Sequence, residues 1–219
     1  DAYVINVRDR ITLTGTLLGP EVTQTLIANG IDSTSGGQYF TNGADTRTKG
    51  VDLVGNYDQD LGALGSVKWT AAWNWNHTEI LDYKQSVDIL GKDYELMNRQ
   101  ARNFITGVQP KTKLLLGSSW KLDDYTLTLG LTRYGAYREV NDANDRSLDR
   151  VYKARWITDL DVGYQLTKDL NLAIGAKNLF DVYPERQNPS SKTMTKGYGA
   201  YSPYGFTGGY YYTRLTYEF

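Results

Sequence analysis

The sequence predicts an all-β fold, an antiparallel transmembrane β-barrel to which this chain contributes eight strands. Three observations lead to this prediction. Apolar and polar residues alternate along eight segments, short and long connections alternate between those segments, and the last segment ends on an aromatic residue. Alternate side chains of a strand point to opposite faces of a sheet, so each segment has one apolar and one polar face.

The eight predicted strands are each long enough to cross a bilayer, which takes roughly 9–11 residues of tilted strand. The clearest alternation has Trp69, Trp73 and Trp75 on one face and Lys68 on the other. The predicted strands are Tyr3–Leu13, Thr48–Asp58, Ser66–Thr78, Lys113–Leu122, Thr126–Tyr137, Trp156–Leu166, Leu170–Asn178 and Gly209–Phe219.

The first predicted strand, Tyr3–Leu13, also alternates. We expect Tyr3, Ile5 and Val7 on its apolar face, with Arg8 and Arg10 on the polar face. In a membrane barrel the apolar face meets lipid and the polar face meets the lumen.

The final predicted strand has an aromatic and aliphatic face that nothing later in the sequence covers. Soluble domains seldom end in this way, whereas in outer-membrane barrels lipid covers that face. We therefore expect the terminal residues to form an assembly signal that the barrel-assembly machinery reads. The residues of this signal are Phe219, Tyr217, Leu215 and Tyr211.

The connections between the predicted strands alternate in length without exception. Bacterial outer-membrane barrels show the same asymmetry, with tight periplasmic turns and long extracellular loops. This pattern sends the first strand outward and places Phe219 on the periplasmic side. The short turns are Gln59–Gly65, Asp123–Tyr125 and Thr167–Asp169, and the long loops are Thr14–Arg47, Glu79–Thr112, Arg138–Arg155 and Leu179–Gly208.

Composition excludes several function classes. The chain has 219 residues, no Cys, one His and a formal net charge of −1. The lack of Cys excludes disulfides and cysteine zinc sites, and the balanced charge argues against a nucleic-acid partner. No nucleophile elbow, phosphate-binding loop or metal-binding pattern occurs, so we predict no catalytic residue, no metal, no cofactor and no enzyme activity. The alternative fold at this point is a soluble all-β sandwich or barrel.

Several segments resemble one family, the TonB-dependent outer-membrane transporters. Lys177–Tyr183 (KNLFDVY) is similar to the signature of the penultimate strand in that family, and a long loop and a strand ending on Phe follow it. Phe40–Asp52 (FTNGADTRTKGVD) resembles a family segment in which a loop re-enters the barrel, and Asp1–Leu13 resembles the strand before it. Arg133–Gly135 matches a further family pattern.

The resemblance implies a location, a function and partners. Such transporters have about twenty-two strands around a plugged lumen. Residues 1–219 then form the C-terminal portion of the barrel, and the plug domain and N-terminal strands are absent from this chain. The family would place the chain in the bacterial outer membrane, surrounded by lipid, as part of a receptor that captures a ferric siderophore. Import would be driven by the TonB–ExbB–ExbD complex through the missing N-terminal segment.

The sequence leaves a second function class open. A self-contained eight-stranded outer-membrane barrel with a structural or adhesive role would carry the same alternation. Pairing between the first strand, Tyr3–Leu13, and the last, Tyr211–Phe219, would close such a barrel.

Aromatic residues in two long loops are the candidate ligand-binding residues. Aromatic rings stack on flat or apolar ligands, and neighbouring cations suit a negatively charged ligand such as a catecholate siderophore. The alternative is that these rings pack loop against loop and form an interfacial girdle. The candidates are Tyr198, Tyr201, Tyr204 and Phe206 in the last loop, Tyr39 and Phe40 at the end of the first, and the cations Arg186, Lys192 and Lys196.

Overall fold

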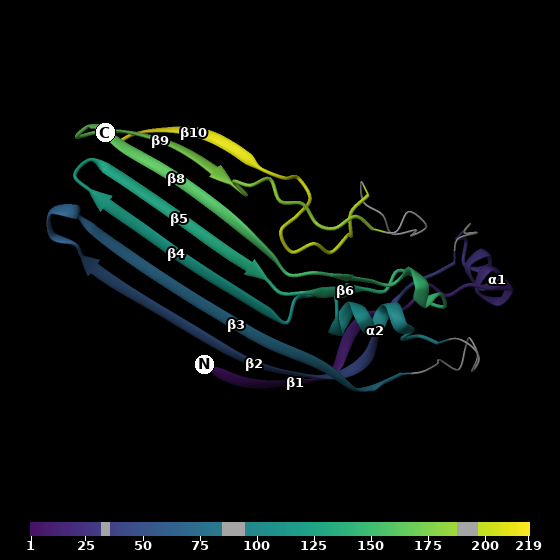
Figure 1. Cartoon of the computed structure of the whole chain (residues 1–219). Coiled ribbons are helices and arrows are strands. Elements are labelled where there is room, and N and C mark those ends of the chain that lie inside the picture. Colours follow the sequence, from purple (N-terminus) through teal and green to yellow (C-terminus); the bar gives the residue numbers. More distant parts are fainter. Residues whose placement is uncertain (32–35, 85–94, 188–196) are drawn as a thin grey trace.

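The protein forms an open, twisted antiparallel sheet of eight strands (Figure 1). The computed structural model describes residues 1–31, 36–84, 95–187 and 197–219. Neighbouring strands follow the order β1-β2-β3-β4-β5-β8-β9-β10. Their bounds are β1 (Ala2–Leu13), β2 (Phe40–Asp60), β3 (Ser66–Tyr83), β4 (Thr112–Leu122), β5 (Tyr125–Tyr134), β8 (Arg155–Thr167), β9 (Leu170–Lys177) and β10 (Tyr210–Tyr217).

All eight predicted strands are confirmed, but some of their boundaries were wrong. β2 begins at Phe40 rather than Thr48, and β3 continues to Tyr83. The first loop and the second are therefore shorter than predicted. The residues beyond the predicted ends also form strand pairs, with Leu13 opposite Phe40 and Ala44 opposite Tyr83. The sheet is therefore longer at this end than the alternating segments predict.

The two ends of the sheet differ as predicted (Figure 1). The three short turns lie together at one end, and the 3₁₀ helix η1 (Gly62–Leu64) occupies the turn between β2 and β3. The long connections lie at the other end, and the C-terminus lies at the short-turn end. The long connections contain helices and short strands that the sequence pattern does not predict: α1 (Pro20–Ala28), α2 (Arg99–Thr106), β6 (Tyr137–Glu139), η2 (Arg146–Leu148) and β7 (Arg150–Tyr152).

The pairing register defines an apolar face and a polar face, because residues directly opposite in antiparallel strands share a face. On the apolar face, Trp73 of β3 lies opposite Leu53 of β2 and Leu114 of β4. On the polar face, Asn74 lies opposite Asp52 and donates a hydrogen bond to its carboxylate. The predicted alternation is therefore confirmed in the centre of the sheet.

The predicted orientation of β1 was wrong. Tyr3 and Ile5 lie opposite Gly50 and Thr48, which belong to the polar face of β2. Their side chains therefore share the polar face, although they are themselves aromatic and aliphatic. The register of β1 also shifts on both sides of Arg10, so the alternation of its sequence does not run through one continuous ladder.

Two tyrosines pack over glycines of the neighbouring strand, one near each edge of the sheet. Tyr3 covers Gly50, and Tyr212 of β10 covers Gly175 of β9; in both pairs a Cβ on the glycine would overlap the phenol ring. The Tyr212 hydroxyl then donates to the carboxylate of Asp161 in β8 at 2.7 Å. A ring that spans three strands in this way fixes the register of β10.

The sheet does not close on itself. Among the described strands β1 pairs only with β2, and β10 only with β9. This finding contradicts the alternative of a closed eight-stranded barrel. Within the described ranges, no helix is long and apolar enough to span a bilayer.

Replacing Gly175 tests the packing of Tyr212. We expect Gly175→Ala to destabilise the barrel by about 1–3 kcal/mol, because the new methyl group displaces the ring and breaks its hydrogen bond to Asp161. Gly55→Ala is the matched control, since a Cβ there meets nothing within 4 Å. Urea unfolding of the purified full-length protein measures both, and equal stability of the two variants would contradict the role given to Tyr212.

Candidate functional site

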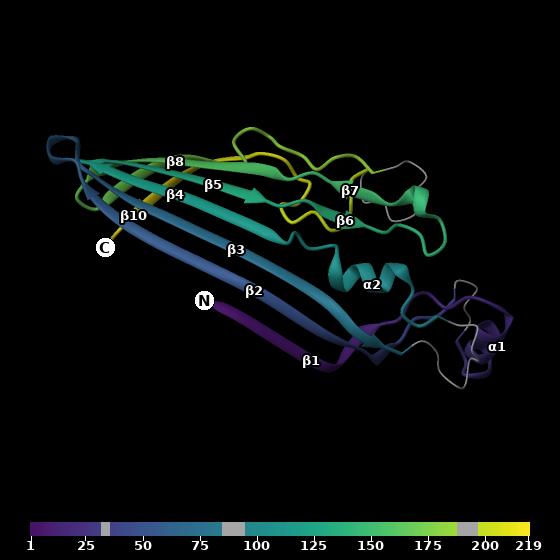
Figure 2. The ribbon, with the colours of Figure 1, turned by 60° about the horizontal axis from the view of Figure 1, so that its bottom comes forward.

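The structured parts of the long connections gather at one end of the sheet, where α2 lies beside β3 and β6 (Figure 2). The first connection has its own small core, in which Leu17 and Val22 pack against Leu96 from the second connection. Leu26 and Tyr39 pack around this cluster. Burial raises the pKa of the Tyr39 hydroxyl above its ordinary value. The first and second connections therefore share a packed core of their own outside the sheet.

Helix α2 is capped and seated by Asn98. The Asn98 side chain accepts a hydrogen bond from the Ala101 amide at 3.0 Å, as an N-cap residue does. It also lies against Gly15, where any larger residue would overlap the Asn98 amide group. The close approach of the Gly15 backbone therefore sets the distance between the first connection and α2.

A cavity of about 950 Å³ lies between one face of α2 and the outer ends of β1, β2 and β3. Thr48 and Asn76 reach it from the polar face of the sheet, together with Arg10. Its aromatic lining comes from Phe40, Phe104 and Tyr201. Two of these rings, Phe104 and Tyr201, meet edge to face with centroids 5.6 Å apart.

A buried carboxylate attaches the last connection to the β6–β7 hairpin. Glu139 is 1% exposed and accepts hydrogen bonds from the Tyr201 amide at 3.0 Å and the Tyr152 hydroxyl at 3.2 Å. Gln187 also donates to it, at 3.2 Å. Gly199 approaches so closely that a Cβ would overlap both Glu139 and Tyr152.

Burial dominates the protonation equilibria of this cluster. It raises the pKa of the Glu139 carboxyl, and the hydrogen bonds from Tyr201 and Tyr152 only partly offset that effect. Burial also raises the pKa of Tyr137 and Tyr152, and the nearby Glu139 raises both further. The two tyrosine rings stack with centroids 4.7 Å apart, so the cluster is held by packing as well as by hydrogen bonds.

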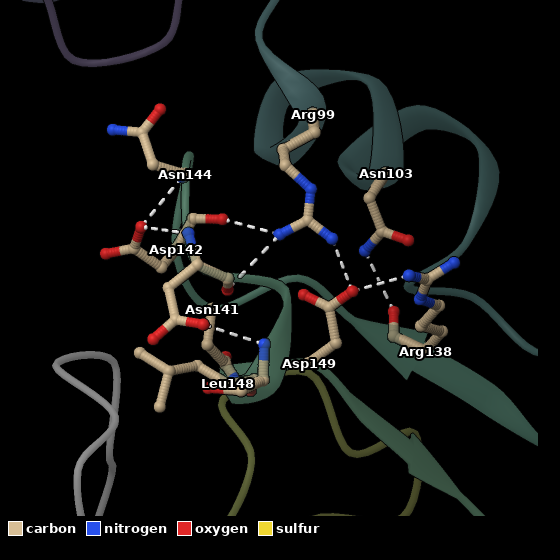
Figure 3. Close-up of polar contacts among 10 residues, drawn as sticks. Arg99, Asn103, Arg138, Asn141, Asp142, Asn144, Leu148 and Asp149 are labelled. Atoms are coloured by element: carbon tan, nitrogen blue, oxygen red, sulfur yellow. Dashed lines mark hydrogen bonds and ion pairs between the residues drawn. The ribbon is translucent and has the colours of Figure 1, made fainter.

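A second polar cluster attaches α2 to the segment between β6 and β7 (Figure 3). Asp149 accepts hydrogen bonds from the guanidinium groups of Arg99 and Arg138. Arg99 also donates to the Asp142 carbonyl at 2.8 Å. Burial acts to raise the pKa of Asp149, but the two arginines outweigh it and the pKa is lowered. The carboxylate therefore stays ionised as the bridge between the helix and the hairpin.

The last connection is held by a further ion-pair cluster. Glu185 pairs with Arg155 at 3.2 Å and with Arg150 at 3.4 Å. Its carboxylate therefore joins the start of this connection to the outer ends of β7 and β8.

The predicted ligand-binding residues do not form one site. Tyr201 and Phe40 line the large cavity, and Phe40 is 74% exposed. Tyr39 packs against the small core of the first connection. Phe206 is half-buried.

The remaining candidates in the last loop pack against neighbouring side chains. Tyr198 stacks on Tyr183 with centroids 5.7 Å apart, and the Arg186 guanidinium lies over the Tyr198 ring at 5.6 Å. Tyr204 packs on Tyr134 with centroids 5.6 Å apart. These contacts match the alternative of packing between loops. Lys192 and Lys196 lie outside the described residues.

Sequence reasoning missed α2, which supplies Phe104 to the cavity. A helical signal is present in the sequence: Gln100, Ala101, Phe104 and Ile105 recur with the spacing of one helix face. The helix has only eight residues, so its periodic pattern covers few positions. The alternation of the neighbouring strands covers more positions and is the stronger signal.

The terminal residues lie where the alternation places them. Tyr211 lies opposite Ala176 and Leu215 opposite Leu172, both on the apolar face. Phe219 packs edge to face on Tyr217 with centroids 5.1 Å apart.

The KNLFDVY segment builds the corner between β9 and the last connection. Asn178 adopts a left-handed conformation with φ of 52°. Its side chain donates to the Val182 carbonyl at 2.8 Å and accepts from the Val182 amide at 2.9 Å. Asp181 accepts from the Gly209 amide at 2.7 Å just before β10. Asn178 thus closes the turn after β9, and Asp181 joins that turn to the start of β10.

The polar groups of the described ranges do not gather into a metal site. Within those ranges, no group of three or more His, Cys, Asp or Glu side chains is placed to hold a metal ion.

Comparison with solved structures shows the same fold in a number of proteins, among them two receptors and a transporter. The pyoverdine receptor FpvA from Pseudomonas aeruginosa PAO1 matches with a TM-score of 0.56 at 15% identity, covering 100% of this chain and 26% of the other. The ferric enterobactin receptor PfeA from Pseudomonas aeruginosa matches with 0.58 at 20% identity, covering 100% and 28%. The copper transporter OprC matches with 0.58 at 17% identity, covering 100% and 29%. This chain thus spans less than a third of each.

Comparison at the level of sequence gives one family. No curated protein sequence matches the chain. The model of the family described as TonB dependent receptor-like, beta-barrel matches residues 1–179. The open antiparallel sheet, the two faces and the family match together show that the chain belongs to the TonB-dependent receptor β-barrel family of the bacterial outer membrane.

Proposed function

We propose that this chain is part of a receptor that captures a ferric siderophore outside the cell and imports it by TonB-driven transport. The observation that carries the proposal is the cavity of about 950 Å³ at the long-loop end of a receptor-family barrel. Long loops of such barrels are extracellular, so the cavity opens where a nutrient first arrives.

The lining of the cavity supports an organic iron chelate as the ligand. Phe40, Phe104 and Tyr201 offer aromatic surface for the flat rings of a catecholate. Arg10 and Lys111 place positive charge in the same lining, which suits the negative charge of the chelate. Two of the similar structures are named for pyoverdine and ferric enterobactin, and the third for copper.

We also propose that the chain forms the C-terminal portion of a larger barrel. In the part of the chain that the structure describes, the outer edges of β1 and β10 have no partner strand. These open edges support the arrangement, because strands in lipid require pairing on both sides. A plug domain and an N-terminal segment that contacts the TonB–ExbB–ExbD complex would then belong to the rest of the receptor. In this arrangement the terminal strand carries the assembly signal formed by Tyr211, Leu215, Tyr217 and Phe219.

Tyr201 tests the proposed ligand site. We expect Tyr201→Ala in the full-length receptor to weaken binding of a ferric catecholate about tenfold, equivalent to about 1.4 kcal/mol, since the variant removes aromatic surface from the cavity. Tyr198→Ala is the control, because Tyr198 stacks on Tyr183 and does not line the cavity. Quenching of tryptophan fluorescence measures the affinity, and copper ions are titrated in parallel.

The two variants separate a ligand role from a packing role. Equal affinities of Tyr201→Ala and the parent receptor would remove Tyr201 from the ligand site. Binding of copper ions without binding of any ferric siderophore would overturn the proposed substrate class.

Deleting Phe219 tests the assembly signal. We expect the truncated receptor to reach the outer membrane at a clearly lower level, because the apolar face of β10 loses its last aromatic contact at Tyr217. Phe219→Tyr is the control and should insert normally, since it keeps an aromatic ring. Surface labelling of intact cells measures the level, and normal insertion of the truncated protein would refute the signal.

A further inference from the structure

A second pocket, of about 300 Å³, lies on the face of α2 opposite the large cavity. Arg99, Arg102, Asn103 and Thr106 line it and recur at the spacing of one helix face. Arg138 from β6 and Arg146 from η2 complete the wall, with Val140. The lining thus holds four guanidinium groups and no carboxylate.

The charges around this pocket are only partly engaged within the protein. The Arg99 guanidinium donates hydrogen bonds to the Asp149 carboxylate and to the backbone carbonyls of Asp142 and Asp145. Arg138 uses one terminal nitrogen on Asp149, and its side chain remains 52% exposed (Figure 3). Among the described residues, Arg146 has no side-chain hydrogen bond or ion pair, and it is exposed.

Arg102 is likewise only partly engaged by hydrogen bonds within the protein. One terminal nitrogen donates to Glu95 at 2.6 Å and to the Tyr83 hydroxyl at 2.9 Å. The nearby carboxylates of Asp142 and Asp145 cap amides of their own loop, at 2.8 Å to Asn144 and 2.8 Å to Ser147. They are therefore directed toward the loop backbone and do not line the pocket.

The two arginines in the first turn of α2 add to the positive end of the helix dipole, and the carboxylates that pair with them are Asp149 and Glu95. The N-terminal end of a helix carries partial positive charge and favours acidic residues in its first turn. The first turn of α2 contains no acidic residue and contains Arg99 and Arg102. An anion in the pocket would offset both the helix dipole and the facing guanidinium groups.

We infer that this arginine pocket binds an oxyanion of the phosphate type, in a site on the other face of α2 from the siderophore cavity, with Thr106 lining both. Guanidinium groups match phosphate oxygens in paired, planar geometry, and a pocket of about 300 Å³ accommodates one phosphate group with part of what bears it. Free phosphate and a phosphorylated lipid headgroup present the same chemistry to the four arginines.

Arg146→Gln in the full-length receptor tests the site without disturbing the fold, because the Arg146 side chain makes no polar contact with the described residues. Inorganic phosphate is titrated by calorimetry into the detergent-solubilised receptor without siderophore. A second arm measures binding to nanodiscs that contain phosphatidic acid. Lys153→Gln is the control, since Lys153 is an exposed cation on the segment after β7 and does not line the pocket.

We expect saturable binding in at least one arm, weakened about tenfold or more by Arg146→Gln and unchanged by Lys153→Gln. The arm that responds identifies the source of the phosphate group. Absence of saturable binding in both arms, or equal weakening by the two variants, would overturn the site. The measurement contains no siderophore, so its outcome is independent of the proposed transport function.

Discussion

Backbone hydrogen bonding is the constraint on which the rest of this structure depends. Lipid offers no partner to the N–H and C=O groups of a strand, so every membrane-spanning strand must be paired on both sides. Six of the eight strands meet this requirement within the described sheet, while β1 and β10 each have one unpaired edge. The pairing register also determines which side chains lie on each face of the sheet, and therefore which of them face the lumen.

The long connections beyond the sheet are held by a different interaction, because no continuous ladder of backbone hydrogen bonds runs through them. Two carboxylates hold them instead: the buried Glu139 attaches the last connection to the β6–β7 hairpin, and the partly buried Asp149 attaches α2 to the same region. The two acids behave in opposite ways. Burial raises the pKa of Glu139, whereas two arginines lower that of Asp149. A scaffold of this kind positions Tyr201 and Phe104 at the cavity through polar contacts with residues that do not line it.

The strands were predictable from the sequence because alternation over ten residues is a strong local signal. The orientation of β1 was the exception. Tyr3 and Ile5 lie on the polar face because of how β1 pairs with β2, and this register cannot be read from the residues of β1 alone. The corner at Asn178 was predictable as a strand end, and the structure adds the hydrogen bonds to Val182. The loop contacts were not predictable, because Glu139 meets Tyr201 across 62 positions in the chain.

Helix α2 has a mechanical consequence that follows from its two faces. One face borders the cavity through Phe104, and the other borders the arginine pocket through Arg102. A shift of α2 toward one of these two pockets would therefore narrow that pocket and enlarge the other. The Asn98 cap and the Asp149 bridge are therefore among the contacts that determine how α2 divides the space between the two pockets.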